Sequence, residues 1–438
     1  MEESAHPAAD HPVAFHRYRG NRWTPKGIYQ RAWAALDRRP LPTRLDRLAR
    51  LAVHHTRRIR FKRGQRRTGE KRRVSRAGVS LSLHPFDRPS VDRVCQAFCS
   101  VHEANEALLR PDGGWDPHPL SRESGTGIRV EEAALRIPGY LGAYDATGDP
   151  EYLERAEGAG EHLLRDRLFA DGHLHLQRHL VPDLPYAFAG RALLLLWDRD
   201  RAGRGGHLDA ACRIGDRLLD YPISGSTNHA CAPAQLLAPL YRATGDRRYL
   251  DGAITRVSRA AITFQLPSGG WGGHESWSWY HAIILRSLIV TYACTPFVPE
   301  RYAANDRLAE AISAGMNLFV ERQEVSGRLS PMGELTSDRE REEVAQSFQR
   351  KSVRFREGRF EPAEVSGPQP SGYELDALVT ACEALGVRPG PTYGMGGWLA
   401  DRAEENHFDL RTLGLGRLLG WLARTPPLRE ASASDAAT

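Results

Sequence analysis

Apolar residues recur at helical spacing beyond residue 84, between short breaks rich in Gly, Pro and Asp. No alternating run of sheet-forming length stands out. The pattern therefore predicts an all-α domain over residues 85–425, with helices joined by short turns. Residues 321–372 interrupt this pattern with a polar stretch, which we expect to be an insertion or a mobile loop near one rim.

Two segments about 100 residues apart repeat one helix–turn–helix signature. Residues 140–153 read YLGAYDATGDPEYL, and residues 240–250 read LYRATGDRRYL. In both, we expect the Gly to end one helix and the Asp to cap the start of the next. The sequence Gly-Gly-Trp also recurs three times, ending at Trp115, Trp271 and Trp398, and we expect a turn between helices at each position.

Repeated helical hairpins must stack to bury their apolar faces. The chain of 438 residues fits a closed (α/α) toroid of about six hairpins better than an open solenoid. We expect three parts: a basic arm over residues 1–84 with helices at 26–37 and 41–54, the toroid, and a disordered tail over 426–438.

Charge is unevenly distributed along the chain. Residues 1–80 hold 21 Lys/Arg against 6 Asp/Glu, whereas the rest holds 39 against 48. The basic arm could contact a polyanion, pack on the acidic body or steer an acidic substrate. No signature of a nucleic-acid-binding module accompanies it, so nucleic acid is not an expected partner. A signal segment and an apolar run of membrane-spanning length are also missing, which favours a cytoplasmic protein without a transmembrane segment.

The first cluster of chemically capable residues is Ser-Thr-Asn-His-Ala at 226–230, opening the helix of the second repeat. Asn228 offers a neutral amide donor, and His229 offers a base that titrates near neutral pH. Placed at a helix start, both would lie at the mouth of a helical ring. The alternative reading is a helix cap with a packed histidine.

The second cluster is Gly-His-Glu-Ser-Trp-Ser-Trp-Tyr-His at 273–281, which precedes the apolar helix 282–292. Two His, one Glu, one Tyr and three Trp fall between residues 271 and 281, more than a helix entrance needs for folding. Aromatic faces suit sugar rings, and the polar groups suit proton transfer.

These motifs together resemble the heparinase II/III-like and alginate-lyase (α/α)-toroid polysaccharide lyases. The resemblance implies β-elimination on a uronate polymer. Asn228 would neutralise the substrate carboxylate, Tyr280 would transfer a proton, and His229 would be the companion base. The residues that would bind the substrate are Trp115, Trp271, His274, Glu275, Trp277 and His281, with the three tryptophans lining the cleft. An acidic polysaccharide or oligosaccharide is then the expected partner.

Other functions stay open at this point. Gly273-His274 followed by Trp277 and Trp279 is similar to a segment of the N-acylglucosamine 2-epimerase family, which implies proton exchange by two histidines such as His229 and His274. A glycoside hydrolase on the same toroid and a non-catalytic glycan-binding or scaffold protein are further alternatives. Gln265 to Trp271 fits a Gln-x-x-x-Gly-x-Trp motif of class II terpene cyclases, but the Asp-x-Asp-Asp acid of those enzymes is missing.

Metal and cofactor sites are not expected. The six cysteines are scattered without a CxxC pair, and phosphate-binding loops are not evident. His173-Leu174-His175 is a weak metal signal on its own.

Overall fold

The computed structural model divides the chain into two compact units, Met1–Asp46 and Arg47–Thr438, and every residue it describes belongs to the second. The predicted helices of the basic arm and most of the predicted tail lie outside the described residues. The described residues are 84–116, 129–168, 172, 174, 183–200, 205–221, 223–297, 304–330, 342, 346, 353–363, 369–405 and 408–426.

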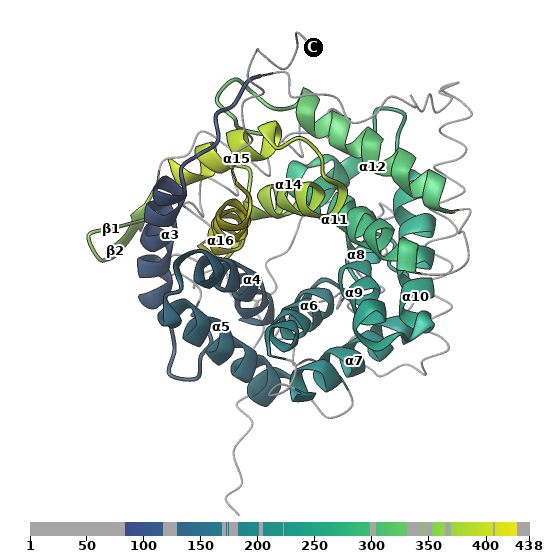
Figure 1. Ribbon diagram of the computed structural model, residues 1–438, viewed down its shortest axis with the longest axis horizontal. Coiled ribbons are helices and arrows are strands. Elements are labelled where there is room, and N and C mark those ends of the chain that lie inside the picture. Colours follow the sequence, from purple (N-terminus) through teal and green to yellow (C-terminus); the bar gives the residue numbers. More distant parts are fainter. Residues whose placement is uncertain are drawn as a thin grey trace, which may run out of the picture. The chain divides into compact units, whose positions relative to one another are not determined.

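Twelve helices of the described part alternate between an outer and an inner layer, which confirms the predicted all-α toroid (Figure 1). The outer helices are α3 (Val91–Glu106), α5 (Pro150–His162), α7 (Gly205–Asp220), α10 (Arg247–Val257), α12 (Ala304–Glu321) and α15 (Gly390–Ala400). The inner helices are α4 (Arg129–Thr147), α6 (Asp183–Arg199), α9 (Ala234–Thr244), α11 (Ser278–Cys294), α14 (Gly372–Leu385) and α16 (Phe408–Arg424).

The two layers differ in the way that their helices are buried. In the inner helix α11, every residue from His281 to Ile289 is buried. The outer helix α10 buries one face, with Tyr249, Leu250, Ala253, Ile254 and Val257, and exposes the other. An inner helix has neighbours on all sides, so it is buried around most of its circumference, whereas an outer helix is amphipathic.

Each inner helix packs against the next, and the last, α16, packs against the first, α4. This contact closes the ring, and glycines on both helices allow a close approach. A Cβ on Gly142 would lie 2.2 Å from the carbonyl oxygen of Gly416, and one on Gly139 would lie 2.0 Å from that of Thr412. The sequence did not determine closure, because the two helices are about 270 residues apart.

The predicted Thr-Gly-Asp turns are confirmed, and both copies make the same hydrogen bonds. Gly148 and Gly245 have positive φ angles of 72° and 74°. Asp149 then accepts from the backbone N–H of Glu151 at 3.0 Å, and Asp246 accepts from that of Arg248 at 2.9 Å. Each turn thus ends an inner helix and caps the following outer helix.

The turn predicted for the three Gly-Gly-Trp sequences is confirmed at two of them. Gly113 and Gly269 have φ angles of 79° and 90° and form tight turns after an outer helix. Trp398, however, lies inside helix α15, so the third predicted turn is wrong. The structure repeats the turn instead at Gly327, where Leu329 replaces the Trp.

The polar insertion contains a small antiparallel hairpin that the sequence analysis missed. Strand β1 (Val353–Arg356) pairs with β2 (Arg359–Pro362) through a turn at Glu357 and Gly358, whose φ angles are 49° and 75°. Two positive φ values are typical of the two-residue turn that suits the twist of a hairpin. Four-residue strands are too short for an alternating pattern to be distinctive.

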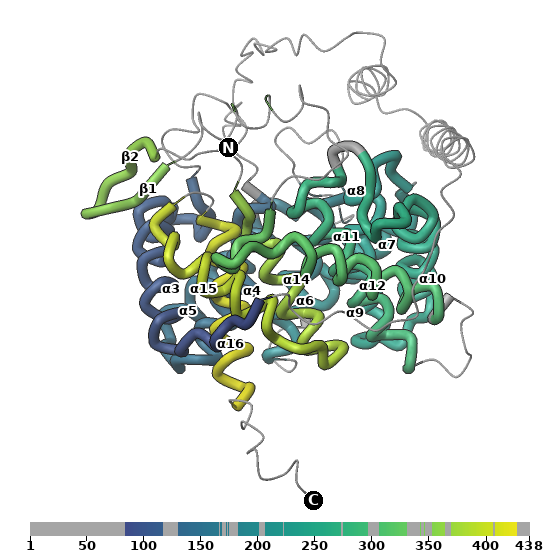
Figure 2. The backbone as a smooth tube through the Cα atoms, turned by 90° about the horizontal axis from the view of Figure 1, so that it is seen from above, coloured from purple at the N-terminus to yellow at the C-terminus, as the bar shows by residue number. Residues whose placement is uncertain are grey.

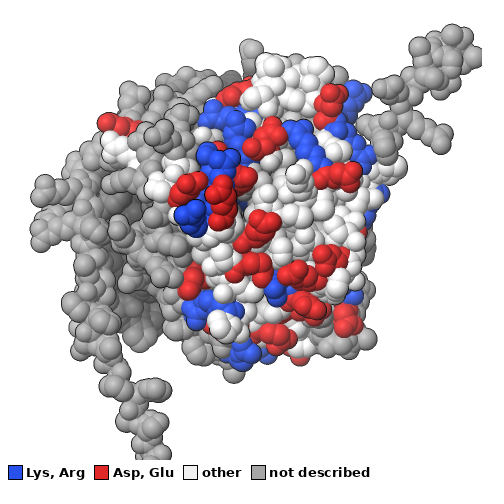
Figure 3. All heavy atoms as spheres, turned by 90° about the vertical axis from the view of Figure 1, so that its left-hand side faces the viewer, with Lys and Arg blue, Asp and Glu red and all other residues white. Residues whose placement is uncertain are grey.

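No helix of the described part is long and apolar enough to cross a membrane. On the side that carries α3 and the hairpin, acidic and basic side chains are interspersed (Figure 3).

Candidate functional site

All six inner helices run in the same direction, because each returns through an antiparallel outer helix. They therefore begin at one end, here called the N-terminal end of the inner ring. Figure 2 shows the short helix α8 (Thr227–Cys231) at this end and the last turns of α16 at the opposite end. The two predicted clusters precede α9 and α11, so both belong to the N-terminal end.

Glu275 connects the two clusters. It lies in the short 3-10 helix η4 (Gly273–Ser276) just before α11, and only 3% of it is exposed. One oxygen, Oε1, accepts from the backbone N–H of Thr227 at 2.8 Å and from the hydroxyl of Ser226 at 3.1 Å. A carboxylate thus fixes the segment before α8 against the segment before α11, 48 residues along the chain.

Asn228 lies on α8 rather than on a continuous helix, because Pro233 separates α8 from α9. The Asn228 side chain is fully buried, and its Oδ1 accepts from the Ser226 hydroxyl at 2.6 Å. Its Nδ2 has no hydrogen-bond partner among the described residues. A buried amide donor without a partner is uncommon and can bind an incoming acceptor. His229 next to it is partly exposed.

Tyr280 is in the first turn of α11 and is also partly exposed. It lies within electrostatic range of Tyr373, in the first turn of α14. Burial raises the pKa of the Tyr373 phenol well above its usual value, and the acids Glu131 and Asp409 raise it further. First-turn side chains of α4, α11, α14 and α16 therefore come together at the N-terminal end.

Glu374 is a functional candidate that the sequence analysis missed. It is fully buried in the first turn of α14, where it accepts from the Ser371 hydroxyl at 2.6 Å and from the Ser278 hydroxyl of α11. Burial raises the pKa of its carboxyl, although these hydrogen bonds oppose the shift. The Ser-x-x-Glu capping box at 371–374 was the signal in the sequence.

The structure places His281 in the core rather than at a binding surface. Its Nε2 lies 3.1 Å from the carbonyl oxygen of Gly315, and its ring packs between Trp271 and Phe319, at centroid distances of 4.9 and 4.5 Å. Burial lowers its pKa to about 3, with Arg322 adding to the shift. His281 therefore packs in the core of this structure with its ring fully buried, and its contact with substrate stays a prediction.

The predicted cleft tryptophans Trp115, Trp271 and Trp277 are each only 1% exposed. Trp115 stacks on Tyr140, Trp271 donates its indole N–H to Ala261 at 2.9 Å, and Trp277 stacks on Trp279. Their rings contact protein in this structure, and their role in lining a cleft stays a prediction. Turn formation and core packing explain why these positions are aromatic. The side chain of His274 lies outside the described residues.

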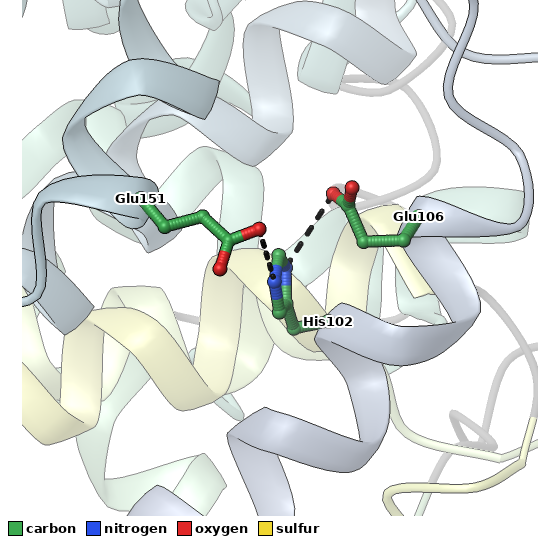
Figure 4. Close-up of side chains that lie close together, drawn as sticks. All are labelled: His102, Glu106 and Glu151. Atoms are coloured by element: carbon green, nitrogen blue, oxygen red, sulfur yellow. Dashed lines mark ion pairs between the residues drawn. The ribbon is translucent and has the colours of Figure 1, made fainter.

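One cluster has metal-ligand types, but it is neutralised by an arginine. His102 lies between Glu106 and Glu151, at 3.7 and 3.5 Å (Figure 4). Arg155 donates two hydrogen bonds of 2.7 Å to Glu106 and one of 3.1 Å to Glu151. A cation would have to displace this guanidinium, so the cluster is best explained as an ion network between α3 and α5.

No family model matches the sequence, and no curated protein matches it. The fold is similar to that of several solved structures at low sequence identity. An unsaturated glucuronyl hydrolase from Streptococcus agalactiae aligns with a TM-score of 0.52 and 12% identity, over 80% of this chain and 98% of that one. A glycosyl hydrolase of family 88 from Bacteroides vulgatus gives 0.53 and 8%, over 76% and 100%. An α-1,6-mannanase from Salegentibacter sp. HEL1_6 gives 0.51 and 12%, over 76% and 99%.

Proposed function

We propose that this protein is a carbohydrate-active enzyme that cleaves a uronate-containing glycan by β-elimination at the N-terminal end of the inner ring. The observation that carries the proposal is the unpartnered, buried Nδ2 of Asn228. The Glu275 hydrogen bonds hold its segment beside the start of α11, which bears Tyr280. The similar solved structures support the class more broadly, because they are carbohydrate-processing enzymes.

In this mechanism, Asn228 Nδ2 donates a hydrogen bond to the uronate carboxylate. That bond stabilises the enolate that forms when the neighbouring C5–H proton is removed. His229 accepts this proton, and Tyr280 donates its phenolic proton to the glycosidic oxygen at C4. The C4–O bond breaks as the C4–C5 double bond forms, so one proton is taken, one is given, and no redox partner is needed.

The test is a panel of uronate polymers with purified protein, followed by the ultraviolet absorbance of the unsaturated product. Tyr280→Phe should lower kcat by about 100-fold or more, because it removes the proton donor. Tyr292→Phe is the matched control, since Tyr292 is at the far end of the same helix α11. No absorbance increase with any polymer, or an unchanged Tyr280→Phe rate, would reject the elimination mechanism.

A second candidate is a glycoside hydrolase that acts on an unsaturated uronyl residue. Two observations favour it: the acids Glu131 and Asp409 that interact with Tyr373, and the similarity to unsaturated glucuronyl hydrolase structures, one of them a complex with dGlcA-GalNAc6S. Hydrolysis by a carboxyl pair needs one protonated acid and one carboxylate. Glu131→Gln and Asp409→Asn would then each abolish turnover.

The two candidates give opposite signals in the same assay. Elimination creates a conjugated double bond, so absorbance rises with a saturated polymer. Hydrolysis of an unsaturated disaccharide leads to loss of that double bond, so absorbance falls. A fall that depends on Glu131 and Asp409 would replace the lyase proposal by the hydrolase.

A further inference from the structure

A polar pocket lies on the outer side of the ring, away from the residues proposed for catalysis. Its volume is about 510 Å³, which is in the range of small-molecule sites. Helix α3, strand β1 and the segment from Ala400 to Glu405 form its walls. None of the residues that line it belongs to the clusters at 226–230 or 273–281.

The walls direct arginines into the pocket by their regular geometry. Helix α3 contributes Arg93, Gln96 and Ser100, whose spacing places them on one helix face. Strand β1 contributes Arg354 and Arg356, which share one face of the strand because they are two residues apart.

The hairpin is fixed to the toroid by its other side. Val353 and Phe355 are buried, and Phe355 packs on Phe360 at a centroid distance of 4.8 Å. The backbone N–H of Phe355 donates to the carbonyl of Glu404 at 2.9 Å. The arginine face of β1 is therefore held in place against the 400–405 segment.

Cations exceed anions among the residues that line the pocket. Three arginines have carboxylate partners there: Arg93 with Asp401, Arg354 with Glu405 at 3.2 Å, and Arg356 with Glu404 at 3.7 Å. The fourth, Arg402, makes no ion pair among the described residues, and its guanidinium lies 4.7 Å from the centroid of the Trp398 ring.

A second arginine, Arg411, lies close to Arg402. Arg411 is only 2% exposed, lies 5.5 Å from the centroid of the same Trp398 ring, and donates to the carbonyl of Glu405 at 3.2 Å. Its Nη1 has no hydrogen-bond partner among the described residues. Burial lowers the pKa of Arg411 to about 10, and the charge of Arg402 contributes to the shift. Among the described residues, Arg402 is thus the pocket-lining guanidinium without an ion pair, and the buried charge of Arg411 adds to the positive potential beside it.

We infer that this pocket binds an acidic sugar unit, with the sugar carboxylate at Arg402 and the hydroxyl groups on the polar side chains around it. Guanidinium and carboxylate match in geometry. The exposed pairs that line the pocket are weak and can exchange partners when a ligand arrives. The pocket would bind a part of an acidic glycan that lies far from the cleaved bond, on the outer side of the ring. It depends on the proposed function only for the choice of ligand.

Hydrogen–deuterium exchange of the full chain with D-glucuronate tests this assignment locally. A monosaccharide has no glycosidic bond to cleave, so the result is independent of any catalytic activity. We expect protection of residues 353–363 and 398–405 in the wild type. Arg402→Gln should need about tenfold more glucuronate for the same protection. Arg359→Gln is the matched control, because Arg359 is on the same hairpin and 82% of its side chain is exposed, but it does not line the pocket.

A second variant tests the charge argument in the opposite direction. Glu404→Gln removes a competing carboxylate, so it should strengthen glucuronate binding severalfold. Four outcomes would overturn the inference: no protection in the wild type, protection confined to residues 226–231 and 278–281, equal protection by glucose, or equal protection by inorganic sulfate. The last two would remove the roles of the carboxylate and of the sugar, respectively.

Discussion

Single polar residues connect distant parts of this chain, and Glu275 does so with one carboxylate oxygen. That oxygen accepts from the Thr227 N–H, and the single hydroxyl proton of Ser226 is shared between this oxygen at 3.1 Å and Asn228 Oδ1 at 2.6 Å. Asn228 is thus oriented through Ser226 rather than by direct contact with Glu275. The position of the proposed carboxylate-binding amide therefore depends on Glu275 through the Ser226 hydroxyl.

Glu275→Ala should destabilise the protein by about 2 kcal/mol, because the buried Thr227 N–H loses its acceptor. Glu275→Gln keeps an acceptor of the same shape and should cost about 1 kcal/mol or less. Urea unfolding of both variants measures the difference. Equal losses in the two variants would contradict the hydrogen-bond explanation.

His281 makes stability depend on pH. Its pKa is lowered to about 3 in the folded state, against about 6.5 in an unfolded chain. The unfolded state therefore binds more protons between these values, so the contribution of this group is complete above pH 6.5 and is lost as pH falls. The expected slope approaches about 1.4 kcal/mol per pH unit.

The measurement compares the wild type with His281→Gln by urea unfolding at pH 7 and pH 5. Both proteins contain the other 16 histidines, so the difference between them isolates His281. The wild type should lose about 1–2 kcal/mol more than the variant on acidification. An identical loss in both proteins would show that His281 is not held neutral.

At the scale of elements, the same type of turn follows more than one outer helix and joins neighbouring helical hairpins. Gln265 donates to Gly269 and to Ala311 of the next outer helix, at 2.9 and 2.8 Å. Gln323 repeats this with Gly327 and Pro391, at 3.0 and 2.8 Å. The Gln-x-x-x-Gly pattern therefore has a structural role here, which accounts for its likeness to a cyclase motif without cyclase chemistry.

Gly269→Ala should destabilise the ring by about 3 kcal/mol or more. Its φ is 90°, and a Cβ would lie 2.1 Å from the carbonyl oxygen of Ala314. Gly358→Ala is the control, because φ is 75° there but no atom lies within 4 Å of the added carbon. That variant should lose only about 1 kcal/mol. Similar thermal shifts in the two would show that backbone conformation, and not the close contact, sets the cost.

At the scale of the whole molecule, one buried carboxylate joins inner helices across the ring. Asp376 of α14 pairs with Arg191 of α6 at 2.9 Å, with Arg286 of α11 at 2.9 Å and with Arg417 of α16 at 3.2 Å. Burial would raise the pKa of Asp376, but these guanidiniums lower it well below its ordinary value. Four of the six inner helices thus share one anion.

Asp376→Asn should destabilise the protein by about 3–5 kcal/mol at pH 7, because the buried Arg191 and Arg286 lose their carboxylate partner, whereas Arg417 keeps Glu383. Since the folded pKa is depressed, this contribution is present above pH 4 and fades below it. Unfolding at pH 7 and pH 3 measures both effects. Asp251→Asn, in a largely exposed pair at 3.8 Å, should change stability by less than about 1 kcal/mol. A small Asp376→Asn effect at pH 7 would contradict the role of Asp376 in joining the inner helices.

The sequence by itself determined the helical period, the Thr-Gly-Asp turns at Gly148 and Gly245, and the stacking of helical hairpins. Those features depend on backbone hydrogen bonds and side-chain spacing within a few residues, so a local pattern contains them. Only the tertiary structure decided that Trp271 and His281 are buried and that Glu275 meets Thr227. It also decided that Asp376 gathers three arginines. Burial and long-range ion pairs depend on which helices become neighbours, and closure of the ring through α4 and α16 sets those neighbours.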